Sequence, residues 1–343
     1  MIESSQLQRA RDLVVQARRI LVATHTKPDG DGCGCVAAMT EALQGLGKEV
    51  CPLFLSPVPT WYQFLSPPQA WLMGRDLTEE DLIRGRVRPF DLIVLLDVSS
   101  RGQLPGLQGY LEAVRTPVLV IDHHPISDGL GDVEMIDPSA VAAGVLVFDL
   151  LRFARWPLTP SIAEALFVAA ATDTGWFQFV NTDSRVYRVC ADLVDAGAGP
   201  AALYARLYQD FAVSRFRLMV AMLNSLELHF DGRFALQVIR RSDFERTGGA
   251  YQDTENLIHE CHRIGTVQAS ALLVETEEGP IRCSLRSRAS RQPGRGEAVD
   301  VSRIAAKFGG GGHKMAAGAF LQGPIEQAAV RIRAEFAPYF PKG

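Results

Sequence analysis

The sequence of 343 residues lacks the features of a secreted or membrane-spanning protein. No apolar run approaches the roughly 20 residues that a helix needs to cross a bilayer, and residues 1–19 have a polar, helical pattern. The six cysteines form no CxxC pair and no secreted-type framework, so we expect reduced thiols. These absences predict a cytoplasmic protein without a membrane partner.

An excess of positive charge is also missing, since 35 Lys and Arg residues stand against 39 Asp and Glu residues. The net charge of −4 argues against a protein that coats long nucleic acid, and so against a long duplex as partner. The distribution is uneven, because residues 281–315 hold eight Lys and Arg but only two Asp and Glu. Such a basic segment suits a phosphate-bearing ligand.

Strand-like runs and helical patterns alternate along the first part of the chain. We expect strands at 20–24, 49–55, 91–97 and 117–121, and helices at 33–46, 140–154 and 161–172. This alternation is typical of an α/β fold in which crossover helices join the strands of a parallel sheet.

The length suits two domains, and a Gly-Ala-Gly-Pro break at 197–200 marks a boundary. We therefore predict an amino-terminal catalytic domain over 1–196, a helical linker over 197–228 and a smaller carboxyl-terminal α/β domain over 229–343. In the last we expect strands at 234–239, 269–274 and 281–285, and helices near 254–264, 299–307 and 324–337.

Acidic and histidine residues stand where the expected strands end. The carboxyl ends of parallel strands meet at one edge of a sheet, where α/β proteins place their sites. Carboxylates and imidazoles are ligands for Mn²⁺, Mg²⁺, Co²⁺ or Zn²⁺. A single Asp at a strand end is more often a helix cap or turn former, but four ordered motifs together predict a binuclear metal site of His25, Asp29, Asp31, Asp97, His123 and Asp173.

These motifs resemble a known family. The triplet Asp122-His123-His124, with the His25 motif before it and the Ala171-Thr-Asp-Thr-Gly175 motif after it, resembles the DHH phosphoesterase superfamily. The tail from Phe308 to Gly318 is similar to the signature of the DHH-associated (DHHA1) domain of the RecJ and nanoRNase type. The resemblance implies an active site in the cleft between the two domains.

The resemblance also implies two divalent metal ions, with Mn²⁺ favoured and Mg²⁺ or Co²⁺ as alternatives. One ion would be held by His25, Asp29 and Asp97. The second would be held by Asp31, Asp97, His123 and Asp173, so that Asp97 is shared. The remaining catalytic roles fall to Asp122, which would orient its neighbours, and to His124, which would contact phosphate or donate a proton.

For the substrate, the glycine loop before His313 lets backbone amides approach an oxyanion, although a flexible connector is the alternative. Arg286 offers a fork-shaped donor for a terminal phosphate. The predicted phosphate contacts are Arg286, Ser287, Gly310, Gly311, Gly312, His313 and Lys314. In the first domain we expect Trp176 or Phe179 to stack on a base, with core packing as the alternative, and Phe177 to pack in the core.

Taken with the resemblance, the sequence predicts a metal-dependent exonuclease that hydrolyses dinucleotides and nanoRNA to nucleoside 5′-monophosphates by two-metal activation of water. Dephosphorylation of 3′-phosphoadenosine 5′-phosphate is a second expected activity. The alternatives are a phosphodiesterase for cyclic di-AMP or pApA, a RecJ-like single-strand exonuclease, a family II pyrophosphatase and an inactive nucleic-acid-binding relative. The partner would be short single-stranded RNA or a nucleotide, and a homodimer is left open.

Overall fold

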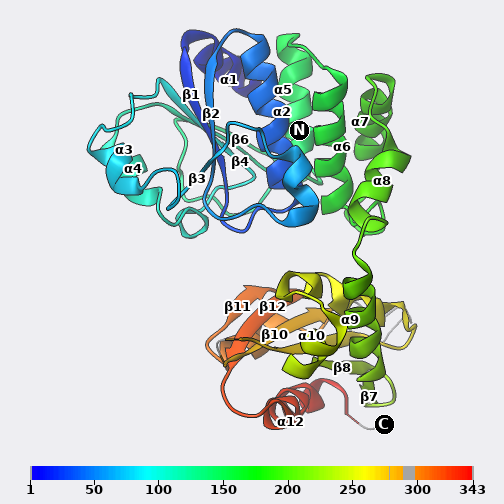
Figure 1. Ribbon diagram of the computed structural model, residues 1–343. Coiled ribbons are helices and arrows are strands. Elements are labelled where there is room, and N and C mark those ends of the chain that lie inside the picture. The colour runs from blue at the N-terminus through cyan, green and yellow to red at the C-terminus, as the bar shows by residue number, and fades with distance from the viewer. Residues whose placement is uncertain (1, 278, 289–297, 342–343) are drawn as a thin grey trace. The chain divides into compact units, whose positions relative to one another are not determined.

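The computed structural model describes residues 2–277, 279–288 and 298–341, and the chain forms two compact units (Figure 1). The first unit spans Met1–Asp210 and the second spans Phe211–Gly343. The boundary falls inside the segment expected to be a helical linker. Of its two helices, α8 (Pro200–Tyr208) belongs to the first unit and α9 (Val213–Asn224) to the second.

The first unit contains a six-stranded parallel sheet, as the sequence predicts. Its strands lie in the order β3-β2-β1-β4-β5-β6, so the strand order reverses between β1 and β4. Helices and loops cover both faces of the sheet, so every residue of β4 is buried. This burial on both faces accounts for the unbroken apolar sequence of the strand. The strands are β1 (Arg19–Thr24), β2 (Glu49–Phe54), β3 (Trp71–Leu72), β4 (Leu92–Leu96), β5 (Val118–Asp122) and β6 (Val133–Ile136).

Alternate side chains of the central strands enter two separate cores. Ile20 and Val22 pack with the longer helices, whereas Leu21 and Ala23 pack with the two short ones. In Figure 1 the short helices lie on one side of the sheet and the longer ones on the other. The longer helices are α1 (Ser4–Gln16), α2 (Gly30–Gly45), α5 (Ala143–Ala154), α6 (Pro160–Asp173) and α7 (Ser184–Asp195), and the short ones are α3 (Glu79–Ile83) and α4 (Gln108–Ala113).

Helices α2 and α6 pack closely because glycines face the contact. A Cβ added at Gly34 would lie 2.4 Å from the carbonyl oxygen of Ala165, and one added at Gly30 would lie 2.3 Å from Oγ1 of Thr172. Bulkier residues would push the helices apart. The glycines therefore bring the start of α2 next to the end of α6.

The second unit contains a six-stranded mixed sheet in the order β11-β12-β10-β9-β8-β7. Only β8 and β9 are parallel among these strands; the other described pairs are antiparallel. Its elements are β7 (Glu227–His229), β8 (Phe234–Ile239), α10 (Arg241–Thr247), β9 (Ala269–Glu275), β10 (Ile281–Ser287), α11 (Val301–Ala306), β11 (Gly311–His313), β12 (Ala316–Leu321) and α12 (Ile325–Phe336). Helices α11 and α12 share a core with one face of the sheet, while α9 packs on the other.

The α-helix expected near 254–264 is replaced by two 3₁₀ segments, η3 (Tyr251–Thr254) and η4 (Leu257–Arg263). Asn256 lies between them with φ of 62°, in the left-handed region that asparagine tolerates better than most residues. This residue prevents one continuous helix. Within the described residues, no helix is both long and apolar enough to span a bilayer.

Candidate metal centre

The histidine and acidic side chains meet at the carboxyl edge of the first sheet. His25 follows β1, Asp97 follows β4, and His123 follows β5 directly. Strands β1 and β4 are neighbours at the point where the strand order reverses. This topological switch point is where open α/β sheets form a crevice for ligands.

The loop after β1 supplies three of the clustered residues. Asp29 caps α2, because its Oδ1 accepts hydrogen bonds from the backbone N–H groups of Asp31 at 3.0 Å and Gly32 at 3.1 Å. Nδ1 of His25 lies 2.8 Å from the carbonyl oxygen of Thr26, which fixes the ring so that Nε2 faces the acidic groups. Nε2 lies 3.8 Å from Oδ1 of Asp29 and 3.4 Å from Oδ2 of Asp97. Asp29 is therefore both a helix cap and a member of the cluster.

Asp31 is held at the start of another helix. Its carboxylate is buried and accepts hydrogen bonds from the N–H groups of Ala143 at 2.6 Å and Gly144 at 2.9 Å. These are the first residues of α5, where unpaired N–H groups favour a negative charge. The position of this carboxylate thus depends on a contact between residues more than a hundred positions apart.

His123 faces three carboxylates. Its Nδ1 lies 3.3 Å from the carbonyl oxygen of Ala140, so Nε2 is directed into the cluster. Nε2 lies at 3.9 Å from Oδ2 of Asp31, 3.6 Å from Oδ1 of Asp97 and 3.4 Å from Oδ2 of Asp173. The cluster therefore joins the ends of β4, β5 and α6.

Asp97 lies between the two groups of side chains. One carboxylate oxygen approaches His25 and the other approaches His123. The buried Oδ1 has no hydrogen-bond partner among the residues that the structure describes. The backbone of Asp97 has φ of 57°, a conformation that costs a non-glycine residue roughly 1–2 kcal/mol. Such strain, kept together with a buried unsatisfied oxygen, is typical of a functional position.

The cluster carries more negative charge than its neighbours compensate. Burial, and then the charge of Asp29, raises the pKa of Asp31 to about 7. Burial, and then the charge of Asp31, raises the pKa of Asp173 to about 7 and that of Asp97 well above its usual value. Burial lowers the pKa of His25, but hydrogen bonds and attraction to Asp29 and Asp97 outweigh it and raise this pKa to about 11. A bound cation would relieve this repulsion.

The donor set fits divalent metal ions. Among the described residues, three groups each have ligand atoms within 4.8 Å of one another. Two of them match the expected ligand sets, one of His25, Asp29 and Asp97 and the other of Asp31, His123 and Asp173, and the third comprises Asp97, Asp122, His123 and His124. Bonds of about 2.0–2.2 Å to an ion would place its ligand atoms roughly 3–4 Å apart, close to the separations given above. The free Oδ1 of Asp97 completes the fit, since a bound ion would give it a partner.

Asp122 and His124 form a pair beside this cluster. Oδ1 of the fully buried Asp122 accepts hydrogen bonds from the backbone N–H of His123 and from Nδ1 of His124, both at 2.8 Å. About a third of the His124 side chain is exposed, and its Nδ1 lies 3.8 Å from Oδ1 of Asp97. Asp122 thus fixes the ring of His124 and the backbone of His123.

The aromatic residues after Asp173 differ in their surroundings. Trp176 makes edge-to-face contacts with Phe167, Tyr204 and Tyr208, and Phe177 stacks on Tyr187. Trp176 is therefore largely engaged inside the unit, whereas 53% of Phe179 is exposed. The exposed tyrosines of α8 were not singled out from the sequence, where their helical spacing gave no sign of their place beside Trp176.

The predicted phosphate contacts of the second unit are also separated by the structure. Arg286 and Ser287 are consecutive in β10 and therefore point to opposite faces of the sheet. The hydroxyl of Ser287 is buried and donates to the carbonyl oxygen of Val299 at 2.6 Å. The side chain of His313 lies outside the described residues, as do residues 289–297 of the basic segment.

The glycines of the loop from Gly310 to Gly312 differ in the space available for a side chain. A Cβ at Gly310 would lie 2.1 Å from the carbonyl oxygen of Gly318, and Gly312 has φ of 138° with a Cβ clash of 2.5 Å against the carbonyl oxygen of Ala316. A Cβ at Gly311 would have nothing within 4 Å, and its φ is not in the left-handed region. The fold therefore requires Gly310 and Gly312 but not Gly311.

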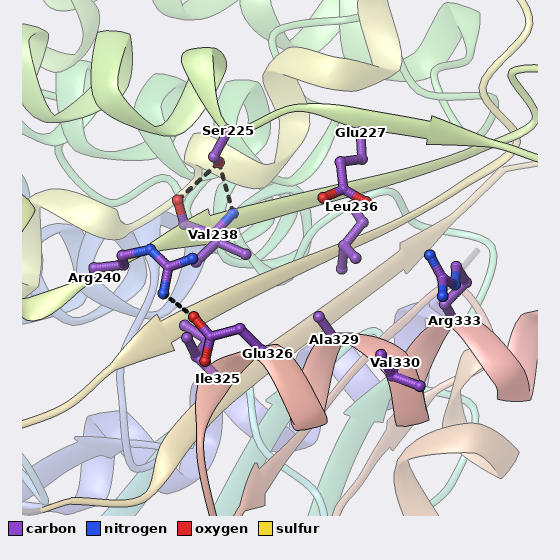
Figure 2. Close-up of a pocket in the computed structure, with 10 residues that line it drawn as sticks. All are labelled: Ser225, Glu227, Leu236, Val238, Arg240, Ile325, Glu326, Ala329, Val330 and Arg333. Carbon is purple, nitrogen blue, oxygen red and sulfur yellow. Dashed lines mark hydrogen bonds and ion pairs between the residues drawn. The ribbon is translucent and has the colours of Figure 1, made fainter.

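A separate pocket of about 160 Å³ lies between β8 and α12 (Figure 2). An ion pair of 2.5 Å between Arg240 and Glu326 crosses it, and Val238 and Ala329 form part of its wall. The residues that line it include none of the predicted site residues.

Comparisons with known proteins agree with this geometry. A model described as "DHH family, N-terminal domain" matches residues 19–171. A Thermus thermophilus protein named "Bifunctional oligoribonuclease and PAP phosphatase NrnA" is 32% identical over 91% of this chain and 87% of its own length. A Bacillus subtilis protein of the same name is 24% identical over 88% of each chain.

Two solved structures share the fold. An exopolyphosphatase-related protein from Bacteroides fragilis has a TM-score of 0.87, with 23% identity and coverage of 98% of this chain and 96% of its own. The exonuclease RecJ bound to manganese has a TM-score of 0.53, with 16% identity and coverage of 99% and 96%.

Proposed function

Because the chain belongs to the DHH family of phosphoesterases, we propose that it hydrolyses dinucleotides and other very short oligoribonucleotides to nucleoside 5′-monophosphates. Removal of the 3′-phosphate from 3′-phosphoadenosine 5′-phosphate is the second activity in the proposal. The observation that carries it is the pair of ligand groups that meet at Asp97. The names of the relatives from T. thermophilus and B. subtilis support the choice of substrates.

The proposal assigns two divalent ions to the cluster, with Mn²⁺ favoured over Mg²⁺ and Co²⁺. His25, Asp29 and Asp97 would hold one, and Asp31, Asp97, His123 and Asp173 would hold the other. When bound, such ions neutralise charge on phosphoryl oxygens and make water a stronger nucleophile at neutral pH. The separations between the histidine and carboxylate atoms support this assignment.

The protein side chains around the cluster hold and orient the reacting groups. Asp122 occupies Nδ1 of His124, so Nε2 of that ring is the atom available to contact the phosphate or to donate a proton to the leaving oxygen. In the second unit, Arg286 and the amides of Gly310, Gly311 and Gly312 would hold a phosphate that is not cleaved. Lys314 and His313 belong to the same proposed set, as does Phe179 for a base.

We place this activity in the cytoplasm. The support is that all six cysteines are unpaired and buried, the usual state in a reducing compartment.

A substrate panel tests the proposal. The full chain with Mn²⁺ is offered RNAs of two to ten nucleotides, a strand of twenty or more, 3′-phosphoadenosine 5′-phosphate and cyclic di-AMP. We expect the highest kcat/KM at two to about five nucleotides, because extra phosphates gain little from an acidic protein. A preference for the long strand with steep salt dependence would point to a RecJ-like exonuclease, and a preference for cyclic di-AMP would point to a cyclic-dinucleotide phosphodiesterase.

A further inference from the structure

Two histidines stand beside Arg286 on the second sheet. His259 and His262 lie in η4, with ring centroids 6.5 Å apart. Nε2 of His262 lies 2.8 Å from Oγ of the fully buried Ser270 in β9. Ser270 pairs in register with Arg286 of the neighbouring strand, so both side chains lie on the same face. The 3₁₀ segment thus brings two imidazoles to the predicted phosphate contact.

The pairing between Ser270 and Arg286 continues across the next two strands to the end of the glycine loop. Arg286 pairs with Ala316 of β12, which pairs in turn with the backbone of His313 in β11. One row across four strands therefore joins Ser270, Arg286 and the end of the loop. These positions therefore lie side by side in one row of the second sheet.

Arg286 has no carboxylate partner among the described residues. Its Nη1 donates only to the carbonyl oxygen of the preceding Leu285, at 3.0 Å. By contrast, Arg282 on the same strand lies 3.8 Å from Glu255, and Arg288 donates to three backbone carbonyls. Burial lowers the pKa of the Arg286 guanidinium. The charge of Glu255 acts on Arg286, but no ion pair within 4 Å is formed among the described residues. A partly buried cation without such an ion pair favours an anionic ligand.

The imidazoles are placed to respond to such a ligand. Burial, and then the positive charges of the neighbouring side chains, lowers the pKa of His262 to about 4. Partial desolvation, and then the charge of Arg286, also lowers the pKa of His259, although much of that side chain is exposed. His262 contacts Ser270, which pairs with Arg286 in the sheet, and the His259 ring lies next to that of His262. Both rings have polar atoms to offer to an oxyanion.

We propose that His259 and His262 join Arg286 in a pocket for the terminal, uncleaved phosphate monoester of the substrate. This inference rests on the proposed function and adds two residues outside the motifs described in the sequence. Arg286 supplies the permanent charge, and the imidazoles supply hydrogen bonds to the remaining phosphate oxygens. The pocket makes the enzyme prefer a dinucleotide that carries a 5′-phosphate over one that does not.

The test compares kcat/KM for a 5′-phosphorylated and an unphosphorylated dinucleotide, using the full Mn²⁺-loaded chain. We expect the ratio to favour the phosphorylated substrate in the wild type and to fall about tenfold in His259→Asn and in His262→Gln, mainly through KM. His229→Gln is the matched control, because His229 pairs with Glu227 in β7, and its ratio should stay at the wild-type value. Thermal melting confirms that each variant is folded.

The possible outcomes distinguish a failure of the proposed function from a failure of the proposed phosphate pocket. A wild type that cleaves neither dinucleotide overturns the proposed function itself. A wild type that cleaves both, with a ratio unchanged by His259→Asn and His262→Gln, overturns only the pocket. A variant that loses both activities equally and melts earlier shows a structural role instead. As a second measurement, AMP added to the full chain without metal should shift the imidazole NMR signals of His259 and His262 but not that of His229, and a lack of shift contradicts the pocket.

Discussion

The carboxylate cluster of the first unit and the basic sheet face of the second are built in opposite ways. In the first, three key side chains have a second contact that fixes them: Asp31 accepts two backbone N–H groups, and the rings of His25 and His123 each meet a backbone carbonyl. In the second, Arg286 donates one hydrogen bond among the described residues, to the carbonyl oxygen of Leu285. The first cluster is ordered by contacts within the fold, whereas Arg286 has few such contacts among the described residues.

This difference predicts where substitutions act. Loss of one member of the fixed cluster leaves other buried charges uncompensated, so its effect should be severe and should appear in metal content and kcat. Loss of a group on the open face removes one contact to the substrate, so its effect should be graded and should appear mainly in KM.

The largest effect is expected for Asp97→Asn. The neutral amide removes the charge that lies between the two ligand groups, so activity should fall by at least about a thousandfold and bound Mn²⁺ should decrease. Turnover of a dinucleotide and metal analysis measure both, with circular dichroism to verify the fold. Asp195→Asn, at an exposed position of α7, is the control. Near-normal turnover of Asp97→Asn would contradict the binuclear assignment.

Metal removal tests the same cluster through stability. Because Asp31, Asp97 and Asp173 repel one another, Mn²⁺ should stabilise the chelator-treated protein by up to about 4 kcal/mol at a concentration 1,000 times its Kd. For a unit of this size we expect a rise in Tm of about 2–4 °C per kcal/mol. The increase should be much smaller in Asp97→Asn, and an equal increase in both proteins would mean that Mn²⁺ binds elsewhere.

A smaller effect is expected on the open face, from Arg286→Ala. The loss of its charge-assisted hydrogen bonds to phosphate should lower kcat/KM for short oligonucleotides by about 10–100-fold, while Mn²⁺ binding is retained. The effect of Mn²⁺ on Tm reports the metal site independently. Wild-type efficiency in this variant would assign another task to the second unit.

The smallest effects should distinguish two neighbouring glycines. Gly311→Ala leaves the fold unchanged, because the new Cβ enters open space, and it should raise KM by a few-fold if a phosphate approaches there. Gly312→Ala should instead lower stability by about 1–3 kcal/mol, since its φ of 138° and the 2.5 Å clash are unfavourable for alanine. Chemical denaturation and steady-state kinetics measure both variants. If Gly311→Ala and Gly312→Ala changed KM by the same factor and stability by the same amount, the distinction between a structural and a ligand-facing glycine would be wrong.

The sequence was sufficient for the parts of the fold that local patterns control. Apolar runs predicted β1, β2, β4 and β5, and the helical patterns predicted α2, α5 and α6, within a few residues of their ends. Short elements such as β3 and β11 have too few residues for a periodic pattern, and their pairing partners are distant in the chain. The interruption at Asn256 likewise could not be predicted, because asparagine is also compatible with a helix.

For the candidate site, the sequence by itself determined the donor types and their order, since oxygen and imidazole ligands at successive strand ends imply a hard-metal site. Only the tertiary structure decided that Asp97 lies between the two groups, because that depends on β1 pairing with β4. It also directed Ser287 to the core face and brought His259 and His262 to Arg286. The physical reason is that local patterns specify which elements form, whereas long-range strand pairing and the packing of connecting segments specify which side chains meet.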